Sequence, residues 1–142
     1  MGTLQFAIKI NAPKEKVWTS LWADDNYRKW TAAFMEGSYA ESDWNEGSKI
    51  SFLTPSGEGM FGVIQTKKLN EQMVFKHLGE VKNGKEELKN WEDATEGYYL
   101  FEADGVTELN VRITFDANPQ FEEYFNNTFP TALNIVKELS EK

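Results

Sequence analysis

The chain has 142 residues, of which 40% are hydrophobic and 14% aromatic, and it carries a formal net charge of -8 at pH 7. This length suits one compact domain with one core, so we expect residues 1–142 to form a single domain. The acidic balance argues against nucleic acid as a partner, because a polyanion would be repelled. The chain has no cysteine, which excludes disulfides, thiolate nucleophiles and zinc sites of the cysteine type.

The N-terminus shows no basic segment followed by an apolar run, and no apolar stretch approaches the roughly 18 residues of a membrane span. We therefore expect no export signal and no membrane span. The absence of cysteine agrees with a reducing compartment, so these features together predict a cytoplasmic protein.

The first predicted element is a strand over residues 4–10, where apolar and polar side chains alternate. A helix follows, because Pro13 suits a first helical position, where its missing N–H needs no partner. Apolar residues then recur at helical spacing over residues 17–22. Asp24 or Asp25 suits the cap of a second short helix, so we expect two helices after the first strand.

From residue 38 onward, short runs of strand-forming residues alternate with turn signals such as Asp104-Gly105. The predicted strands cover residues 38–41, 49–54, 59–68, 73–79, 95–103 and 107–115. With the first strand they form an antiparallel meander. Residues 80–93 are too polar for the core and predict a surface loop, in which Trp91 either folds over a cavity mouth or anchors the loop.

A long helix closes the chain. Asn118-Pro119 is a good start signal, and apolar residues from Phe121 to Leu139 follow one helical face. Pro130 lies inside this pattern, where it removes a backbone hydrogen bond. We therefore expect a helix that is kinked or broken into two segments, either as a hinge above a pocket or to wrap a curved sheet.

Signals for catalysis and metal binding are weak. His77 is the single histidine, and the spacing of the carboxylates suggests no metal site around it. Residues 57–62 read G-x-G-x-x-G, but no helix is predicted after them, so they cannot present a helix N-terminus to a pyrophosphate. No G-x-S-x-G elbow is present. We expect neither a metal nor a cofactor.

His77 is nevertheless a candidate for chemistry. It alternates with Met73 and Phe75, so the three side chains point the same way from their strand. On a concave face, His77 would be a polar group in an apolar pocket. The alternative is a histidine that is hydrogen-bonded in the core or at the sheet rim. General acid/base work by His77 or by a buried carboxylate stays open.

Several local motifs, in this order of elements, resemble a known superfamily. The motifs are Ala12-Pro13 with Val17-Trp18, Trp30, Trp44-Asn45-Glu46-Gly47-Ser48, Gly62 with Ile64, Met73-Val74-Phe75-Lys76-His77 and Glu108-Leu109-Asn110-Val111. They look like the helix-grip superfamily known as START or Bet v 1-like (SRPBCC), in the branch similar to the activator of heat-shock protein 90 ATPase. The chain lacks the Gly-Trp pair that commonly opens the last helix of the family, and His77 stands where relatives often carry tryptophan.

The resemblance implies an α+β fold, in which a curved antiparallel sheet of six or seven strands wraps around a long C-terminal helix. Two short helices after the first strand close one end, and a hydrophobic cavity lies between sheet and helix. Family members mostly bind lipids, sterols, polyketides or other apolar molecules, and a few are cyclases or hydrolases.

Residue type and strand parity predict an aromatic wall for this cavity. Its predicted members are Trp30, Phe34, Phe52, Phe75, His77, Tyr98, Phe115, Phe121 and Phe125. The leading hypothesis is a non-catalytic binding protein for a small apolar molecule such as a lipid or polyketide. The alternatives are a chaperone-related protein-interaction module and a cyclase- or hydrolase-like enzyme. Both a monomer and a homodimer stay open, because a free sheet edge can pair.

Overall fold

The computed structural model describes residues 2–89, 91, 94–115 and 119–142, with the side chains of residues 119–121 outside the description. Three helices and eight strands lie within these residues. The helices are α1 (Lys14–Trp22), α2 (Asp24–Thr31) and α3 (Pro119–Glu141). The strands are β1 (Gly2–Ile10), β2 (Tyr39–Glu41), β3 (Lys49–Leu53), β4 (Gly59–Lys68), β5 (Gln72–Lys82), β6 (Lys85–Leu88), β7 (Thr95–Ala103) and β8 (Val106–Phe115).

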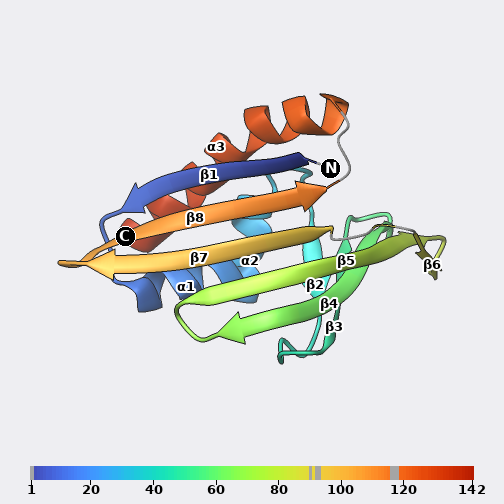
Figure 1. Ribbon diagram of the computed structural model, residues 1–142, viewed down its shortest axis with the longest axis horizontal. Helices are drawn as coiled ribbons and strands as arrows, with labels where there is room; N and C mark the ends of the chain where they lie inside the picture. Colours follow the sequence, from blue (N-terminus) through green and yellow to red (C-terminus); the bar gives the residue numbers. More distant parts are fainter. Residues whose placement is uncertain (1, 90, 92–93, 116–118) are drawn as a thin grey trace.

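The strands form one antiparallel sheet in the order β1-β8-β7-β5-β4-β3-β2, and β6 pairs with the far end of β5. Figure 1 shows the helices on one side of this sheet, with α3 crossing behind β1 and with α1 and α2 behind β7. Helix α3 packs on β1, α1 and α2. The predicted α+β architecture, a curved antiparallel sheet with two short helices after the first strand and a long terminal helix, is confirmed.

The prediction of a surface loop over residues 80–93 is wrong in its first half. Strand β5 continues to Lys82, a turn follows at Asn83 and Gly84, and β6 returns along β5. Both turn residues have positive φ, 53° and 74°, as a tight hairpin turn requires. The sheet therefore has eight strands among the described residues, where six or seven were expected.

The prediction of a terminal helix in two segments is also wrong. Helix α3 runs through Pro130 as one element. Pro130 itself is exposed, whereas Phe129, Leu133 and Val136 are buried against the rest of the molecule. This apolar face fixes the helix on both sides of the proline, so one missing backbone hydrogen bond does not end it. The predicted cap at Asn118 lies outside the described residues.

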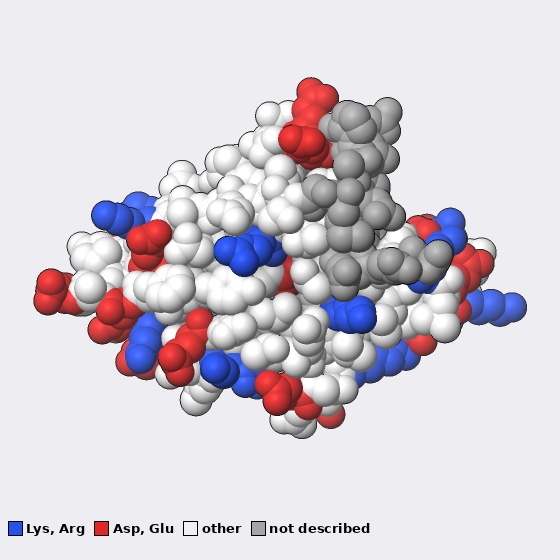
Figure 2. Space-filling model, viewed as in Figure 1, with Lys and Arg blue, Asp and Glu red and all other residues white. Residues whose placement is uncertain are grey.

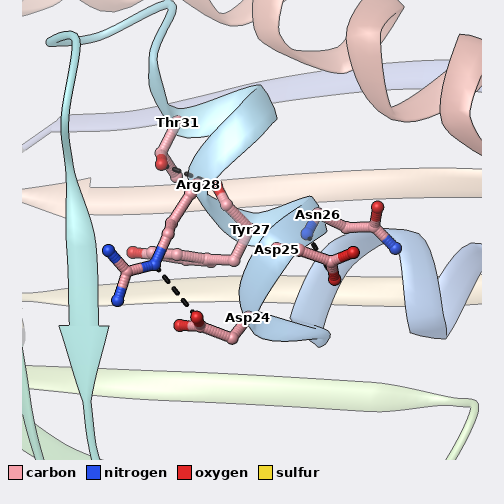
Figure 3. A network of polar contacts seen from close by, with 6 residues as sticks. All are labelled: Asp24, Asp25, Asn26, Tyr27, Arg28 and Thr31. Atoms are coloured by element: carbon pink, nitrogen blue, oxygen red, sulfur yellow. Dashed lines mark hydrogen bonds and ion pairs between the residues drawn. The ribbon is translucent and has the colours of Figure 1, made fainter.

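Helix α2 begins differently from the prediction. Ala23 is its N-cap, and Asp24 and Asp25 lie in the first turn, where their charges still favour the positive end of the helix dipole. Asp24 pairs with Arg28 at 3.0 Å (Figure 3). The Arg28 guanidinium also lies 5.2 Å from the centre of the Tyr39 ring, which ties α2 to β2.

The core lies between the helices and the inner face of the sheet. Along β8 the residues at alternate positions from Thr107 to Ile113 are buried, as a strand with one covered face requires. A second, smaller cluster holds Leu53, Phe61 and Val81 at the other end of the sheet. Figure 2 shows the opposite, outer face, where charged side chains gather toward the two ends and uncharged surface covers much of the middle.

Candidate ligand-binding site

The predicted wall residues form a continuous chain of aromatic contacts. The ring centroids of Phe52 and Phe75 are 5.1 Å apart, and Phe75 lies 6.3 Å from Tyr98. Tyr98 in turn contacts Trp30 at 6.0 Å, and Trp30 contacts Phe34 at 6.4 Å. Strands β3, β5 and β7 and helix α2 therefore contribute to one aromatic layer.

Helix α3 extends this layer. Phe129 contacts Phe34 at 4.8 Å and Phe125 at 5.8 Å, and Phe125 contacts Phe115 at 5.9 Å. Phe129 was not among the predicted wall residues, although it shares a helical face with Phe125. The side chain of Phe121 lies outside the described residues, so its place in the wall stays a prediction.

Burial divides the wall into two parts. Trp30, Phe75 and Tyr98 are only 2%, 1% and 1% exposed, and the Trp30 indole N–H donates to the carbonyl of Leu21 at 2.9 Å. These three side chains are packed core. The partly buried members are Phe34, Phe52, Phe115 and Phe125. This partly buried end of the layer is therefore the candidate site for a ligand.

A buried polar group lies at this end. His77 on β5 is 8% exposed, and its Nε2 atom lies 3.1 Å from Oε1 of Glu96 on β7. The second carboxylate oxygen of Glu96 accepts a hydrogen bond from the Tyr98 hydroxyl. The ring of Phe52 covers His77 with centroids 5.3 Å apart. Because a carboxylate can only accept, this geometry assigns the Nε2 proton of His77 to the bond with Glu96.

The other ring nitrogen of His77 is unused. Its Nδ1 atom is buried and has no hydrogen-bond partner among the described residues. In the neutral imidazole with a proton on Nε2, Nδ1 is an acceptor, and in the imidazolium it becomes a donor. His77 can therefore hold one polar group of a bound molecule or exchange a proton with it.

The tyrosines around Glu96 keep their protons. Burial raises the pKa of Tyr98 well above its ordinary value, and the charge of Glu96 adds to the rise. Burial and Glu96 raise the pKa of Tyr27 in the same way. The Tyr98 hydroxyl is thus a permanent donor that orients Glu96, and Glu96 in turn orients His77.

The pairing of β5 with β4 fixes the position of His77 in the sheet. A register shift between Phe61 and Gly62 places Gly62 directly opposite His77. A Cβ atom at Gly62 would lie 2.0 Å from the carbonyl oxygen of Lys76, so only glycine fits this close approach. The backbone N–H of His77 donates to Ala94 at 2.8 Å, which fixes the strand on its other side.

Sequence reasoning predicted the burial of His77 but missed Glu96. The signal was present, because Glu96 alternates with Tyr98 and Leu100 along β7, and Tyr98 was predicted to point inward. A carboxylate with that parity was a candidate partner for the single histidine. Among the described residues, no group of three or more potential ligands is arranged to hold a metal ion.

Two surface hollows are lined by residues that the structure describes, and neither of them lies between the sheet and α3. One, of about 320 Å³, lies on the outer face of the sheet near Tyr99, Phe101 and Arg112. The other, of about 280 Å³, lies beside α1 near Trp18 and Trp44.

Comparison with known proteins places the chain in a family. Residues 11–141 match the family described as Activator of Hsp90 ATPase homolog 1-like protein. The chain belongs to this family. A search of curated proteins by sequence finds no significant match.

Solved structures of similar fold agree with this membership. The Aha1 dimer from Colwellia psychrerythraea superposes with a TM-score of 0.74 at 18% identity, over 99% of this chain and 97% of that chain. Protein NE0264 from Nitrosomonas europaea gives 0.71 at 16%, over 96% and 92%. DynU16, a putative protein in the dynemicin biosynthetic locus, gives 0.69 at 12%, over 96% of this chain and 46% of that chain. At these identities the likeness concerns the fold.

No helix among the described residues is long and apolar enough to cross a membrane.

Proposed function

We propose that this protein is a non-catalytic binding protein for a small apolar molecule that carries one polar group, such as a lipid or a polyketide. The ligand would lie between the sheet and α3, at the partly buried end of the aromatic layer. The observation that carries the proposal is the unpartnered Nδ1 atom of His77, which is buried next to aromatic side chains.

The wall residues make different contacts with the proposed ligand. Phe34, Phe52, Phe115 and Phe125 contact the apolar part of the ligand, since they are only partly buried in the free protein. The packed core behind them is Trp30, Phe75 and Tyr98. Phe121 stays a predicted member of the wall, because its side chain lies outside the described residues. A hydroxyl of the ligand donates to Nδ1 of His77. No cofactor is required by this binding mode.

The energetics favour a ligand with such a donor. A buried acceptor without a partner costs about 1–3 kcal/mol, which a ligand hydroxyl recovers when it binds. Each apolar side chain that the ligand removes from water adds to the affinity at roughly 25 cal/mol per Å². Aromatic burial supplies the affinity, and His77 selects among apolar molecules.

Native mass spectrometry of the protein purified from its own host tests the proposal. We expect a stoichiometric small-molecule adduct that is released on denaturation. His77→Gln, which keeps a donor toward Glu96, and Phe52→Ala should both lower its occupancy about tenfold or more. Phe101→Ala is the matched control, because Phe101 is 62% exposed on the outer face.

A clean apo mass, together with no thermal shift across a panel of lipids and polyketides, would contradict the proposal. Equal occupancy in wild type and in both site variants would also contradict it, because the adduct would then lie elsewhere.

A second candidate is a chaperone-related protein-interaction module. It is favoured by the description of the family and by the exposed Phe101 on the outer face. Exposed aromatic side chains often anchor protein interfaces. A chain that carries no adduct but raises the ATPase rate of an Hsp90 chaperone, in a way that Phe101→Ala abolishes, would support this candidate over a ligand carrier. The similar Aha1 from Colwellia psychrerythraea is a dimer, so a homodimer and a monomer both stay open for this chain.

An enzyme remains the third candidate, because the contact of His77 with Glu96 resembles a general acid/base pair. A cyclase- or hydrolase-like turnover would require His77 as proton shuttle. Full turnover in His77→Gln would contradict an enzymatic function that depends on His77. The cytoplasmic location stays a prediction under all three candidates.

A further inference from the structure

We propose a second binding site, for a small aromatic carboxylate, in the hollow beside α1. This tryptophan groove has a volume of about 280 Å³, and its lining includes Trp18, Trp22, Trp44, Lys67 and Met73. It lies between the C-terminal end of α1 and the β4–β5 hairpin, and it is not part of the space between the sheet and α3. The inference is independent of the function proposed above.

One of the residues that line the groove holds a buried donor without a partner. Trp22 is 8% exposed, and its indole Nε1 atom is buried without a hydrogen-bond partner among the described residues. The nearby Trp30 differs, since its indole N–H is satisfied by the Leu21 carbonyl. An indole N–H donates and cannot accept, so the group that would satisfy Trp22 is an acceptor.

One basic residue lies among those that line the groove. Lys67 lines it, and its ammonium donates one hydrogen bond to the carbonyl oxygen of Trp44 at 2.6 Å. Two further N–H groups of an ammonium remain for a ligand. None of the residues that line the groove is acidic. A carboxylate is an acceptor for an indole N–H and an anion for an ammonium, so it is the ligand group that the proposal assigns to this groove.

The acidic residues nearest to Lys67 are already engaged. Glu46 accepts a hydrogen bond from the backbone N–H of Lys67 at 2.9 Å. Asp43 accepts from the backbone of Asn45 at 3.0 Å, and a hydrogen bond from Ser48 is the main cause that lowers its pKa. The charge of Lys67 also contributes to the lowered pKa of Asp43, so a bound anion would share the Lys67 ammonium with that carboxylate.

The walls are rigid and aromatic. Trp44 has φ +63°, a left-handed conformation that a bulky residue rarely adopts. It is held there by hydrogen bonds to Ser42 and Lys67. Its ring lies 5.9 Å from Trp22 and 6.4 Å from Phe75. This fixed wall suits a flat apolar body that stacks on tryptophan.

The size of the groove limits the ligand. Its volume lies near the lower end of the usual range for ligand pockets, about 300–1,000 Å³. We therefore expect a molecule of one or two aromatic rings with a single carboxylate. Phenylacetate and indole-3-acetate are suitable probes, and indole-3-acetamide and tryptamine are their neutral and cationic counterparts.

Nitrogen-15 NMR of the indole N–H groups tests the site, because the chain has five tryptophans and so five such signals. Comparison with Trp22→Phe assigns the Trp22 signal. Titration with indole-3-acetate should shift this signal in a saturable way, and the amide and the amine should bind more weakly. Lys67→Met should weaken carboxylate binding about tenfold. Lys68→Met, the next residue on β4, is the matched control and should leave binding unchanged.

Three outcomes would overturn the inference: no shift of the Trp22 signal at millimolar carboxylate, equal binding of the amide and the carboxylate, or unchanged binding in Lys67→Met. Lys67 is only partly buried, so Lys67→Met keeps the test valid if Trp22→Phe does not fold. The test is separate from that of the interior site, because Lys67→Met should leave the adduct that depends on His77 unaffected.

Discussion

Each of the two proposed binding sites depends on one buried polar atom, Nδ1 of His77 in the first and Nε1 of Trp22 in the second. Folding took both away from water without giving them a partner among the described residues. Such atoms are costly, at about 1–3 kcal/mol each. They are therefore the places where a bound molecule gains most, the first as an acceptor and the second as a donor.

The alternation of Met73, Phe75 and His77 predicted that these three side chains share one face of their strand, and all three are buried. The partner of His77 was not evident, because Glu96 is distant in the sequence. Only the pairing of β5 with β7, which sets Phe75 opposite Glu96, brings them together. The contact of His77 with a ligand stays a prediction.

Tyr98 gives a prediction at this scale. The pKa of Tyr98 in the folded protein is raised above its ordinary value of 10, so the hydroxyl ionises first in the unfolded chain. The free energy of unfolding is therefore fully retained below pH 10 and falls as the pH rises above that value. Each such buried tyrosine contributes a slope of about 1.4 kcal/mol per pH unit in that range. Tyr98→Phe should therefore flatten the alkaline decline in the free energy of unfolding, measured by urea denaturation between pH 9 and 11.

The same variant should lose about 1–3 kcal/mol at pH 7, because Glu96 loses its hydroxyl donor. An alkaline slope identical to that of the wild type would show that the Tyr98 hydroxyl does not titrate with unfolding. Tyr27 retains its own raised pKa in this variant, so some slope should remain.

At the scale of elements, the strands with one covered face were predicted well and the exposed hairpin was not. Thr107 to Ile113 alternate between buried and partly or fully exposed positions, which makes β8 visible in the sequence. All four residues of β6 are exposed. A strand with no covered face has no apolar period, so residues 85–88 resembled a loop. The Asn83-Gly84 pair was the remaining signal for a hairpin.

The prediction for helix α3 was wrong for the opposite reason, because the local signal of Pro130 does not decide whether the helix continues. Pro130 predicted a break, but Phe129 and Leu133 on either side of it are 2% exposed in the core. Burial of such side chains contributes about 1.5–3 kcal/mol each, which exceeds the loss of one backbone hydrogen bond. Tertiary packing therefore decides the continuity of this helix.

Replacement of this proline tests that account. Pro130→Ala restores the backbone donor in an exposed position of an intact helix, so it should raise the free energy of unfolding by about 1–3 kcal/mol. Chemical denaturation measures the change, and Thr131→Ala at the neighbouring exposed position is the control. An unchanged or lower stability in Pro130→Ala would show that the proline is accommodated without cost.

At the scale of the whole molecule, all three helices share one face of one sheet, and a single main core joins them. The core cluster includes Ile10 of β1, Val17 of α1, Trp30 of α2, Phe75 of β5 and Val136 of α3. Elements from the beginning, middle and end of the chain therefore depend on the same packing. This supports the prediction that residues 1–142 form one domain.

Differential scanning calorimetry tests the prediction of one domain. We expect one transition with an unfolding enthalpy of about 100 kcal/mol near 60 °C, equal to the van't Hoff enthalpy. Two resolved transitions, or a van't Hoff enthalpy that falls well short of the calorimetric one, would show that the chain unfolds in more than one unit.

The sequence by itself determined the class of fold and the family, and it predicted which side chains of a strand share a face. These follow from local period, turn chemistry and motifs, which neighbouring residues encode. The contact between His77 and Glu96, the unpartnered N–H of Trp22 and the tryptophan groove were decided only by the tertiary structure. They depend on which strands and helices meet across the fold, and on whether each buried polar atom finds a partner there.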